Sequence, residues 1–222
     1  MPGIEQRNEP LHHYSEKEAT PMRRSLTALI AVGITVLSLA TGATAASAAP
    51  NAAAGPQDFA LVIDQFATSG PGGQSDQYIQ IQNISQAART LSGFSVDAWL
   101  SQSVRALSVT IPVGVTLYQN DVYVIANADA FSGPPGVVNQ YWSGIALPSR
   151  LGLCLMGPTN ARVDAVATTP GTPCQMGATP AAAQPPGNAP DAVVRHSNTG
   201  DNGRDFHIGF RTPGTPSHVD PF

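Results

Sequence analysis

The stretch Tyr78-Ile79-Gln80-Ile81-Gln82-Asn83 decides the fold class, because apolar and polar side chains alternate along it. In an extended chain, successive side chains point to opposite faces, so the two isoleucines lie on one face and the tyrosine and both glutamines on the other. One apolar and one polar face are typical of a strand with one side against a core. We therefore predict a half-buried β-strand over residues 78–83.

Six further segments with the same alternation, or with a short apolar run, lie on both sides of this strand. They are residues 59–66, 94–100, 107–113, 122–126, 151–156 and 162–167. Turn residues separate them, as in Gly157-Pro158-Thr159-Asn160, which predicts a hairpin between the last two. No window has a sustained helical period. Many short strands without helices predict an all-β domain built as a sandwich or a barrel.

Two of these segments also indicate their place in a sheet. Residues 59–66 are nearly continuous in apolar side chains, which favours a central strand with both faces covered. Pro112 favours an edge position for the strand of residues 107–113, because proline lacks the N–H group that a central strand needs for its hydrogen bonds.

The N-terminal part of the chain has the pattern of a secretory signal peptide. Arg23 and Arg24 precede a largely apolar run over residues 26–40, and Ala46-Ser47-Ala48 is a small-x-small cleavage site. The apolar run is shorter than the roughly 20 residues of a membrane-spanning helix. We expect residues 1–48 to be removed by cleavage near Ala48, which leaves a secreted protein without a membrane span.

Two features of this leader stay open. Residues 1–21 are polar, so they are either a long leading region or the result of a misassigned start, with Met22 as the true first residue instead of Met1. Arg23 and Arg24 also fit part of a twin-arginine signal. The export route is therefore either the twin-arginine route or the general secretory route.

The charges of the chain after residue 48 are unusual, with seven arginines and eleven aspartates but no lysine or glutamate. Lysine and glutamate are good helix formers, so their absence there agrees with an all-β domain. An acidic domain without a basic cluster does not suit the phosphate backbone of nucleic acids.

Residues 49–57 are rich in alanine, glycine and proline and indicate a linker, so we place one domain over residues 58–218.

Cys154 and Cys174 are the two cysteines of the chain. An even pair in an exported chain predicts one disulfide. Closing the loop of about 20 residues between them would stabilise the fold by about 3 kcal/mol in the chain-entropy model. The bridge would hold residues 169–190, a stretch with six prolines that is expected to form neither strand nor helix. A loop this long is either functional or loosely ordered.

Several motifs and their order resemble the lamin tail domain family, in its exported bacterial type. The matching segments are the alternating strand 78–83, Leu91-Ser92-Gly93-Phe94-Ser95-Val96, Val163-Asp164-Ala165-Val166, residues 198–206 and Thr212-Pro213-Gly214-Thr215-Pro216. The resemblance implies an immunoglobulin-like β-sandwich that serves as a binding or tethering module. Gln80 stands where the family has a glutamate, so no role for a carboxylate is carried over to that position.

Residues 198–205 are the densest in oxygen ligands. Asp201 and Asp205 are the candidate ligands of a calcium ion, which takes roughly six to eight oxygens. The alternative is a structural turn, since Asp and Asn side chains also bond to their own backbone.

Arg195 lies close by in the sequence, and we expect it to form a structural ion pair with Asp164 or Asp201. Recognition of a ligand by this arginine is the alternative.

Tyr141 and Trp142 follow a glycine- and proline-rich stretch and indicate a surface contact for a glycan or a peptide.

The histidines after residue 48, which are His196, His207 and His218, are scattered along the chain. The sequence contains neither a Gly-x-Ser-x-Gly nucleophile turn nor a paired-histidine zinc spacing. We therefore expect no catalytic residue and no cofactor apart from the calcium ion considered above.

Three functions follow from these patterns, in order of preference. The first is an exported non-enzymatic module that binds or scaffolds a protein or glycan partner at the cell envelope or outside the cell. The second is a calcium-stabilised structural domain, and the third is an uncharacterised hydrolase. The first predicts that residues 141–142 and the loop 169–190 form the contact surface. It also predicts that deleting residues 175–189 leaves the fold largely intact.

Overall fold

The computed structural model describes residues 60–217. The expected signal peptide (1–48), the expected linker (49–57) and His218 lie outside the described residues. The described part consists mainly of short strands, with one helix of four residues. In chain order, the elements are β1 (Leu61–Ala67), β2 (Tyr78–Asn83), β3 (Arg89–Thr90), β4 (Ser95–Trp99), β5 (Arg105–Thr110), β6 (Thr116–Leu117), β7 (Val122–Asn127), β8 (Gln140–Trp142), β9 (Gly152–Met156), β10 (Arg162–Ala167), β11 (Asp191–Arg195), α1 (Asn202–Asp205) and β12 (Phe206–Phe210).

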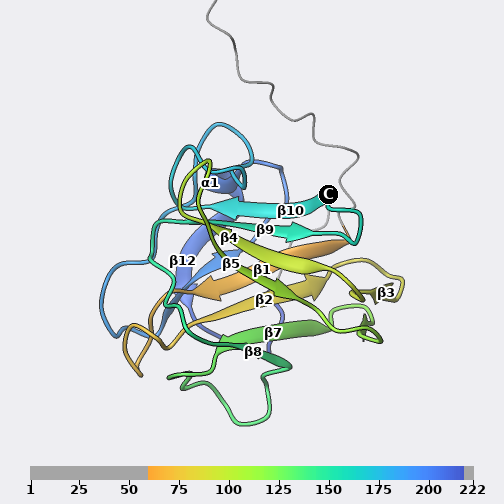
Figure 1. Ribbon diagram of the computed structural model, residues 1–222, viewed down its shortest axis with the longest axis horizontal. Coiled ribbons are helices and arrows are strands. Elements are labelled where there is room, and N and C mark those ends of the chain that lie inside the picture. Colours follow the sequence, from red (N-terminus) through yellow and green to blue (C-terminus); the bar gives the residue numbers. More distant parts are fainter. Residues whose placement is uncertain (1–59, 218–222) are drawn as a thin grey trace, which may run out of the picture. The chain divides into compact units, whose positions relative to one another are not determined.

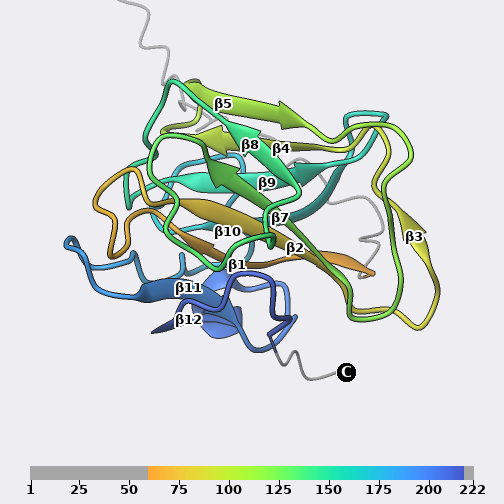
Figure 2. The same ribbon diagram turned by 90° about the horizontal axis from the view of Figure 1, so that it is seen from below.

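The strands form two main sheets and a small ribbon (Figure 1). The larger sheet has the order β12-β11-β1-β2-β7-β8, and the smaller sheet has the order β10-β9-β4-β5. Strands β3 and β6 pair in the ribbon. Strand β8 runs parallel to β7, and the other pairs are antiparallel. Figure 2 shows β4 and β5 toward the top and β1, β2, β11 and β12 toward the bottom. The predicted all-β sandwich is confirmed.

Side chains from both sheets meet in one apolar core. Ile79 and Ile81 of β2 belong to it, as the alternation predicts, and both are fully buried. Val96, Leu153 and Leu155 of the smaller sheet lie in the same cluster. Complete burial of an apolar side chain of this size stabilises a fold by about 1.5–3 kcal/mol. The core therefore holds the two sheets face to face.

Strand β1 lies between β2 and β11, so the predicted central position of this segment is confirmed. The register of β1 with β2 shifts between Ile63 and Gln65, which marks a β-bulge. Because of the bulge, Asp64 and Gln65 both reach the outer face of the sheet, where Asp64 meets Gln80 and Gln65 meets the hydroxyl of Tyr78. Two polar side chains in succession thus lie on the face that points away from the core.

The expectation that β2 is half-buried is wrong, because all six of its residues are buried. Its inner face lies against the core, and its outer face is covered by the C-terminal segment, residues 211–217. Gln80 Nε2 donates to the carbonyl of Thr215 at 2.8 Å, and Gln80 Oε1 accepts from the N–H of Gly214 at 2.8 Å. Alternation along a strand shows which face is polar, but it does not show what covers that face.

The predictions for the smaller sheet agree with the structure. Strand β5 is an edge strand, as Pro112 indicated. Strands β9 and β10 pair as a hairpin around residues 157–160. Asn160 has a φ of 60° in this turn. Asparagine is one of the few residues besides glycine that readily adopt this left-handed backbone conformation, which explains its place there.

Candidate functional site

Arg195, at the end of β11, is the centre of a buried polar network. Its side chain has no solvent exposure, and its Nη2 lies 2.6 Å from a carboxylate oxygen of Asp164 on β10. Its Nη1 lies 3.8 Å from the carboxylate of Asp205, and its Nε donates to the carbonyl of Ile63 at 2.9 Å. The guanidinium carbon lies 4.3 Å from the centre of the Phe206 ring. The structure thus brings Arg195 and Asp164 together, and this one side chain joins β11 to four other elements, which are β1, β10, α1 and β12.

The surroundings of Asp164 explain why this carboxyl needs its partners. Burial raises the pKa of Asp164, whereas the charge of Arg195 and the hydrogen bond from the N–H of Ile63 at 2.6 Å act in the opposite direction. An unpaired carboxylate in this position would carry a large desolvation cost. Because a ligand cannot reach it, we assign Arg195 to holding β11 on the sandwich and not to ligand recognition.

Asp201 and Asp205, the candidate calcium ligands, hold their loop through bonds to the chain itself. Asp205 is buried and accepts hydrogen bonds from the N–H groups of Thr199 at 2.7 Å and Gly200 at 3.0 Å. Asp201 is the N-cap of α1 and accepts from the N–H of Gly203 at 3.0 Å. Within residues 60–217, no three His, Cys, Asp or Glu side chains are arranged to hold a metal ion. The contacts within the protein favour the structural turn, and calcium binding by this loop stays the untested alternative.

The loop between β10 and β11 is fastened to the domain at several points. The predicted disulfide is confirmed, with the Cα atoms of Cys154 and Cys174 5.2 Å apart. Further along the loop, the buried side chain of Gln184 accepts from the N–H of Thr68 at 2.6 Å and donates to the carbonyl of Ser69 at 3.0 Å. The residues between β10 and β11, all of them described, form neither strand nor helix, as expected. These contacts show that the loop is packed onto the domain.

The structure does not support the expected independence of residues 175–189 from the fold. The side-chain oxygen of Asn202 accepts from the N–H groups of Met176 at 2.9 Å and Ala167 at 3.0 Å. The N–H of Ala181 donates to the carbonyl of Ala167 at 2.8 Å. Deleting the segment would leave buried polar groups unpaired, which costs about 1–3 kcal/mol for each group. Such a deletion cannot separate binding from folding.

Only one of the two aromatic residues predicted as a surface contact is exposed. Tyr141 is 58% exposed, whereas Trp142 is 5% exposed and belongs to the core. The two residues lie in strand β8 and not in an irregular stretch, so successive side chains alternate between solvent and core. The indole N–H of Trp142 donates to the carbonyl of Ile145 at 3.0 Å. The predicted surface contact is therefore wrong for Trp142, and for Tyr141 it stays a prediction.

A second polar cluster holds the C-terminal segment. Arg211 Nη1 lies 2.8 Å from the carboxylate of Asp76, and both side chains are buried. Burial acts to raise the pKa of Asp76, but hydrogen bonds from Arg211 and from Ser132 outweigh it and hold the pKa below its ordinary value. Gln65 accepts from the N–H of Thr212 at 3.0 Å. No local sequence pattern marks this cluster, because its members are far apart along the chain.

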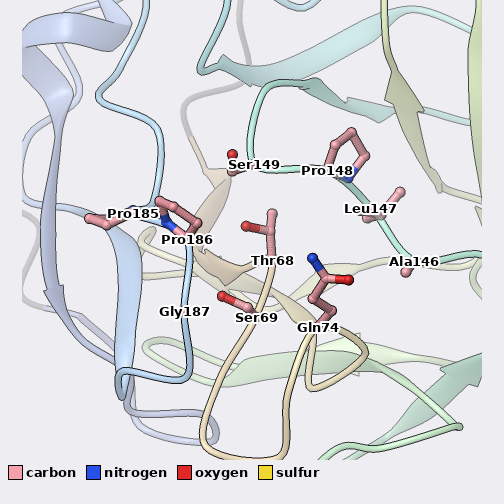
Figure 3. A pocket seen from close by; sticks show the side chains of 10 residues that line it. All are labelled: Thr68, Ser69, Gln74, Ala146, Leu147, Pro148, Ser149, Pro185, Pro186 and Gly187. Carbon is pink, nitrogen blue, oxygen red and sulfur yellow. The ribbon is translucent and has the colours of Figure 1, made fainter.

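An open cleft lies where three loops meet (Figure 3). Its volume is about 280 Å³. The loops are the turn after β1, the segment before β9 and the proline-rich loop before β11. Figure 3 shows two prolines of the last loop on one side, the segment before β9 on the other, and the β1 turn between them. The lining residues are Thr68, Ser69, Gln74, Ala146, Leu147, Pro148, Ser149, Pro185, Pro186 and Gly187.

The lining of this cleft combines polar and apolar residues and contains no ionisable side chain. Gln184 fixes the backbone of Thr68 and Ser69 through the two hydrogen bonds described above, so this part of the wall is held in place. Among the contacts of residues 60–217, none engages the amide of Gln74 or the hydroxyl of Ser149. These two groups are therefore available to a ligand. The prolines form stiff walls, because the ring of proline fixes the backbone angle φ.

A second hollow, of about 410 Å³, lies along the C-terminal segment. It is lined by Pro71, Ser132, Gly133, Pro134, Pro190, Arg211, Thr212, Pro213 and Thr215. Its one ionisable lining residue, Arg211, is already paired with Asp76. The cleft of Figure 3 offers more unengaged polar groups and is the better candidate site.

Comparisons with known proteins do not assign the chain to a family. No family model matches it, and no curated protein matches it. In the part of the chain that the structure describes, no helix has both the length and the apolar character needed to cross a membrane. The relation to lamin tail domains therefore rests on the sequence motifs and stays a prediction.

Proposed function

We propose that the chain is an exported, non-enzymatic binding module of the lamin tail type, and that the cleft between the three loops holds its ligand. We further propose that this ligand is a neutral glycan at the cell envelope or outside the cell. The observation that carries the proposal is an open, uncharged cleft with both polar and apolar lining residues on a two-sheet scaffold. Loops that a rigid scaffold positions are the usual place for binding residues.

The chemistry of the lining favours a sugar. The hydroxyl groups of a sugar donate and accept hydrogen bonds, as do the amide of Gln74 and the hydroxyl of Ser149. A lining without ionisable side chains gives no counter-charge to a phosphate or a carboxylate ligand. The volume of about 280 Å³ lies just below the range of about 300–1,000 Å³ for ligand pockets, which suits a short glycan segment. A neutral peptide is the alternative that the experiment below must separate.

The carboxyl groups with raised pKa values are not placed to act as catalytic acids or bases. Catalytic acids and bases combine a shifted pKa with access to a substrate. The two carboxyl groups with raised pKa values, Asp64 and Asp164, are buried and bonded within the fold. The disulfide supports an oxidising environment such as the outside of the cell.

A capture experiment tests the proposal. The form that begins at Ala49 is immobilised and exposed to envelope material and culture fluid of the source organism, with and without calcium, and is also applied to an array of neutral and charged glycans. We expect retention of a neutral glycan that does not depend on calcium. Retention of a peptide alone, of charged glycans alone, or of nothing would contradict the proposal.

A further inference from the structure

Two histidines that belong to none of the sites described above lie side by side on the surface of the domain. His196 directly follows β11, and His207 is the second residue of β12. The two strands pair antiparallel, with Arg195 opposite Phe206 and Val194 opposite His207. Both imidazoles are exposed. The contact therefore follows from strand pairing, which brings together residues that are eleven positions apart in the sequence.

The two rings face each other through the same kind of nitrogen. The Nδ1 atoms of His196 and His207 are 3.1 Å apart, and the ring centres are 5.0 Å apart. Without a metal ion, one Nδ1–H donates a hydrogen bond to the other Nδ1, and the tautomers of the two rings decide which is the donor.

The distance also fits chelation. Imidazole nitrogens bind divalent transition metals at about 2.0–2.1 Å. Two such nitrogens on one ion, at angles of about 90–110° between them, lie about 2.8–3.4 Å apart in tetragonal or tetrahedral geometry. The observed separation falls inside this range.

Gly209 provides room next to the pair. It lies two residues beyond His207 on the same face of β12, and a Cβ atom there would come within 3.2 Å of His207 Nε2. That distance is tighter than ordinary van der Waals contact. A side chain at this position would therefore crowd the imidazole of His207 in the orientation that faces His196.

We propose that His196 and His207 form a surface site for a divalent transition metal ion, with both Nδ1 atoms as ligands and with water in the remaining positions. By the usual order of stability for nitrogen ligands, Cu²⁺ binds more tightly than Ni²⁺ or Zn²⁺. The site is separate from the glycan cleft, so this proposal does not depend on the proposed function.

The test uses the form that begins at Ala49, which contains all the described residues, 60–217, and lacks the histidines of the expected signal peptide region. The protein is purified without a histidine tag and titrated with Cu²⁺, Ni²⁺ and Zn²⁺ by calorimetry. Electron paramagnetic resonance of the Cu²⁺ form counts the bound nitrogens. The variants are His196→Ala and His207→Ala, with His218→Ala as the matched control.

We expect one Cu²⁺ ion per chain with two nitrogen ligands, and an affinity that falls at least about tenfold in each variant of the pair but not in the control. Both side chains are exposed, so the variants should keep the melting temperature of the unaltered protein without metal. Equal affinity in all four proteins, a loss only in His218→Ala, or the absence of binding would overturn the proposal.

Discussion

The side-chain amide of Gln80 donates to the carboxylate of Asp64 across 2.6 Å on the outer face of the larger sheet. The same amide holds the C-terminal segment through Gly214 and Thr215. Asp64 accepts from the N–H of Ser217 at 3.2 Å. The pair therefore joins the central strands to the last described residues and explains why a polar sheet face is buried.

Gln80→Glu tests this relationship, because it replaces the NH2 group of the amide by an oxygen and keeps the size of the side chain. A glutamate cannot donate to Asp64 or to Thr215, and when ionised it places a second negative charge beside Asp64. We expect a loss of about 2–3 kcal/mol in the free energy of unfolding at neutral pH, measured by urea denaturation. The matched control is Gln102→Glu, at an exposed position in the turn before β5. Equal stability of the two variants would contradict the role of Gln80.

Asp64 makes the stability of the fold depend on pH. Burial raises its pKa above the ordinary value of 3.8, although hydrogen bonds from Gln80 and Ser217 act against the rise. Its contribution to stability is fully present below the unfolded pKa and is lost as pH rises through the higher pKa of the folded state. We compare the free energy of unfolding of the unaltered protein with that of Asp64→Asn, and we expect the difference between them to shift against the unaltered protein as pH rises from about 3.8. Urea denaturation at a series of pH values measures both free energies. A difference that stays constant, or that shifts in favour of the unaltered protein, would show that the account of Asp64 is wrong.

Arg195→Met removes the charge that two buried carboxylates share. Breaking a buried ion pair by removing one partner costs about 3–5 kcal/mol, because the other charge is left unpaired. The matched control is Arg105→Met, since the side chain of Arg105 is 50% exposed and pairs with Asp97 at 3.0 Å. We expect the control to lose about 1 kcal/mol or less. Urea denaturation of both variants gives the comparison, and similar losses would contradict a special role for Arg195.

Calcium removal tests the loop of Asp201 and Asp205. The carboxylate of Asp205 accepts hydrogen bonds from two backbone N–H groups, and Asp201 caps α1, so the loop is held by bonds within the protein. We expect EDTA to leave the melting temperature unchanged in differential scanning calorimetry. A fall that calcium reverses would instead support the calcium-stabilised domain that the sequence also allowed.

Local patterns predicted much of the sandwich. The alternation of residues 78–83, the apolar run that became β1 and the turn at residues 157–160 depend on neighbours in sequence, which a pattern can show. The disulfide followed from the presence of two cysteines in an exported chain. The buried outer face of β2 did not follow, because the segment that covers it lies more than a hundred residues away.

The candidate site was harder to predict. The cleft combines residues from positions 68–74, 146–149 and 185–187, and none of these segments carries a motif by itself. Trp142 was expected at the surface because the pattern of a three-residue strand is too short to show which side chain enters the core. The neighbouring position of His196 and His207 depends on the register of β11 and β12, which the sequence analysis did not identify.

Blocking the cleft tests the central claim most directly. Ala146 is exposed and lines the cleft, so Ala146→Trp should fill the space that the ligand needs. Val113→Trp, at a position 90% exposed in the loop before β6, serves as the control. Binding of neutral glycans by the two variants and the unaltered protein is measured by calorimetry. We predict that Ala146→Trp weakens binding at least about tenfold and that Val113→Trp leaves it unchanged. Equal binding by all three proteins, or no binding of a neutral glycan by the unaltered protein, would contradict the account.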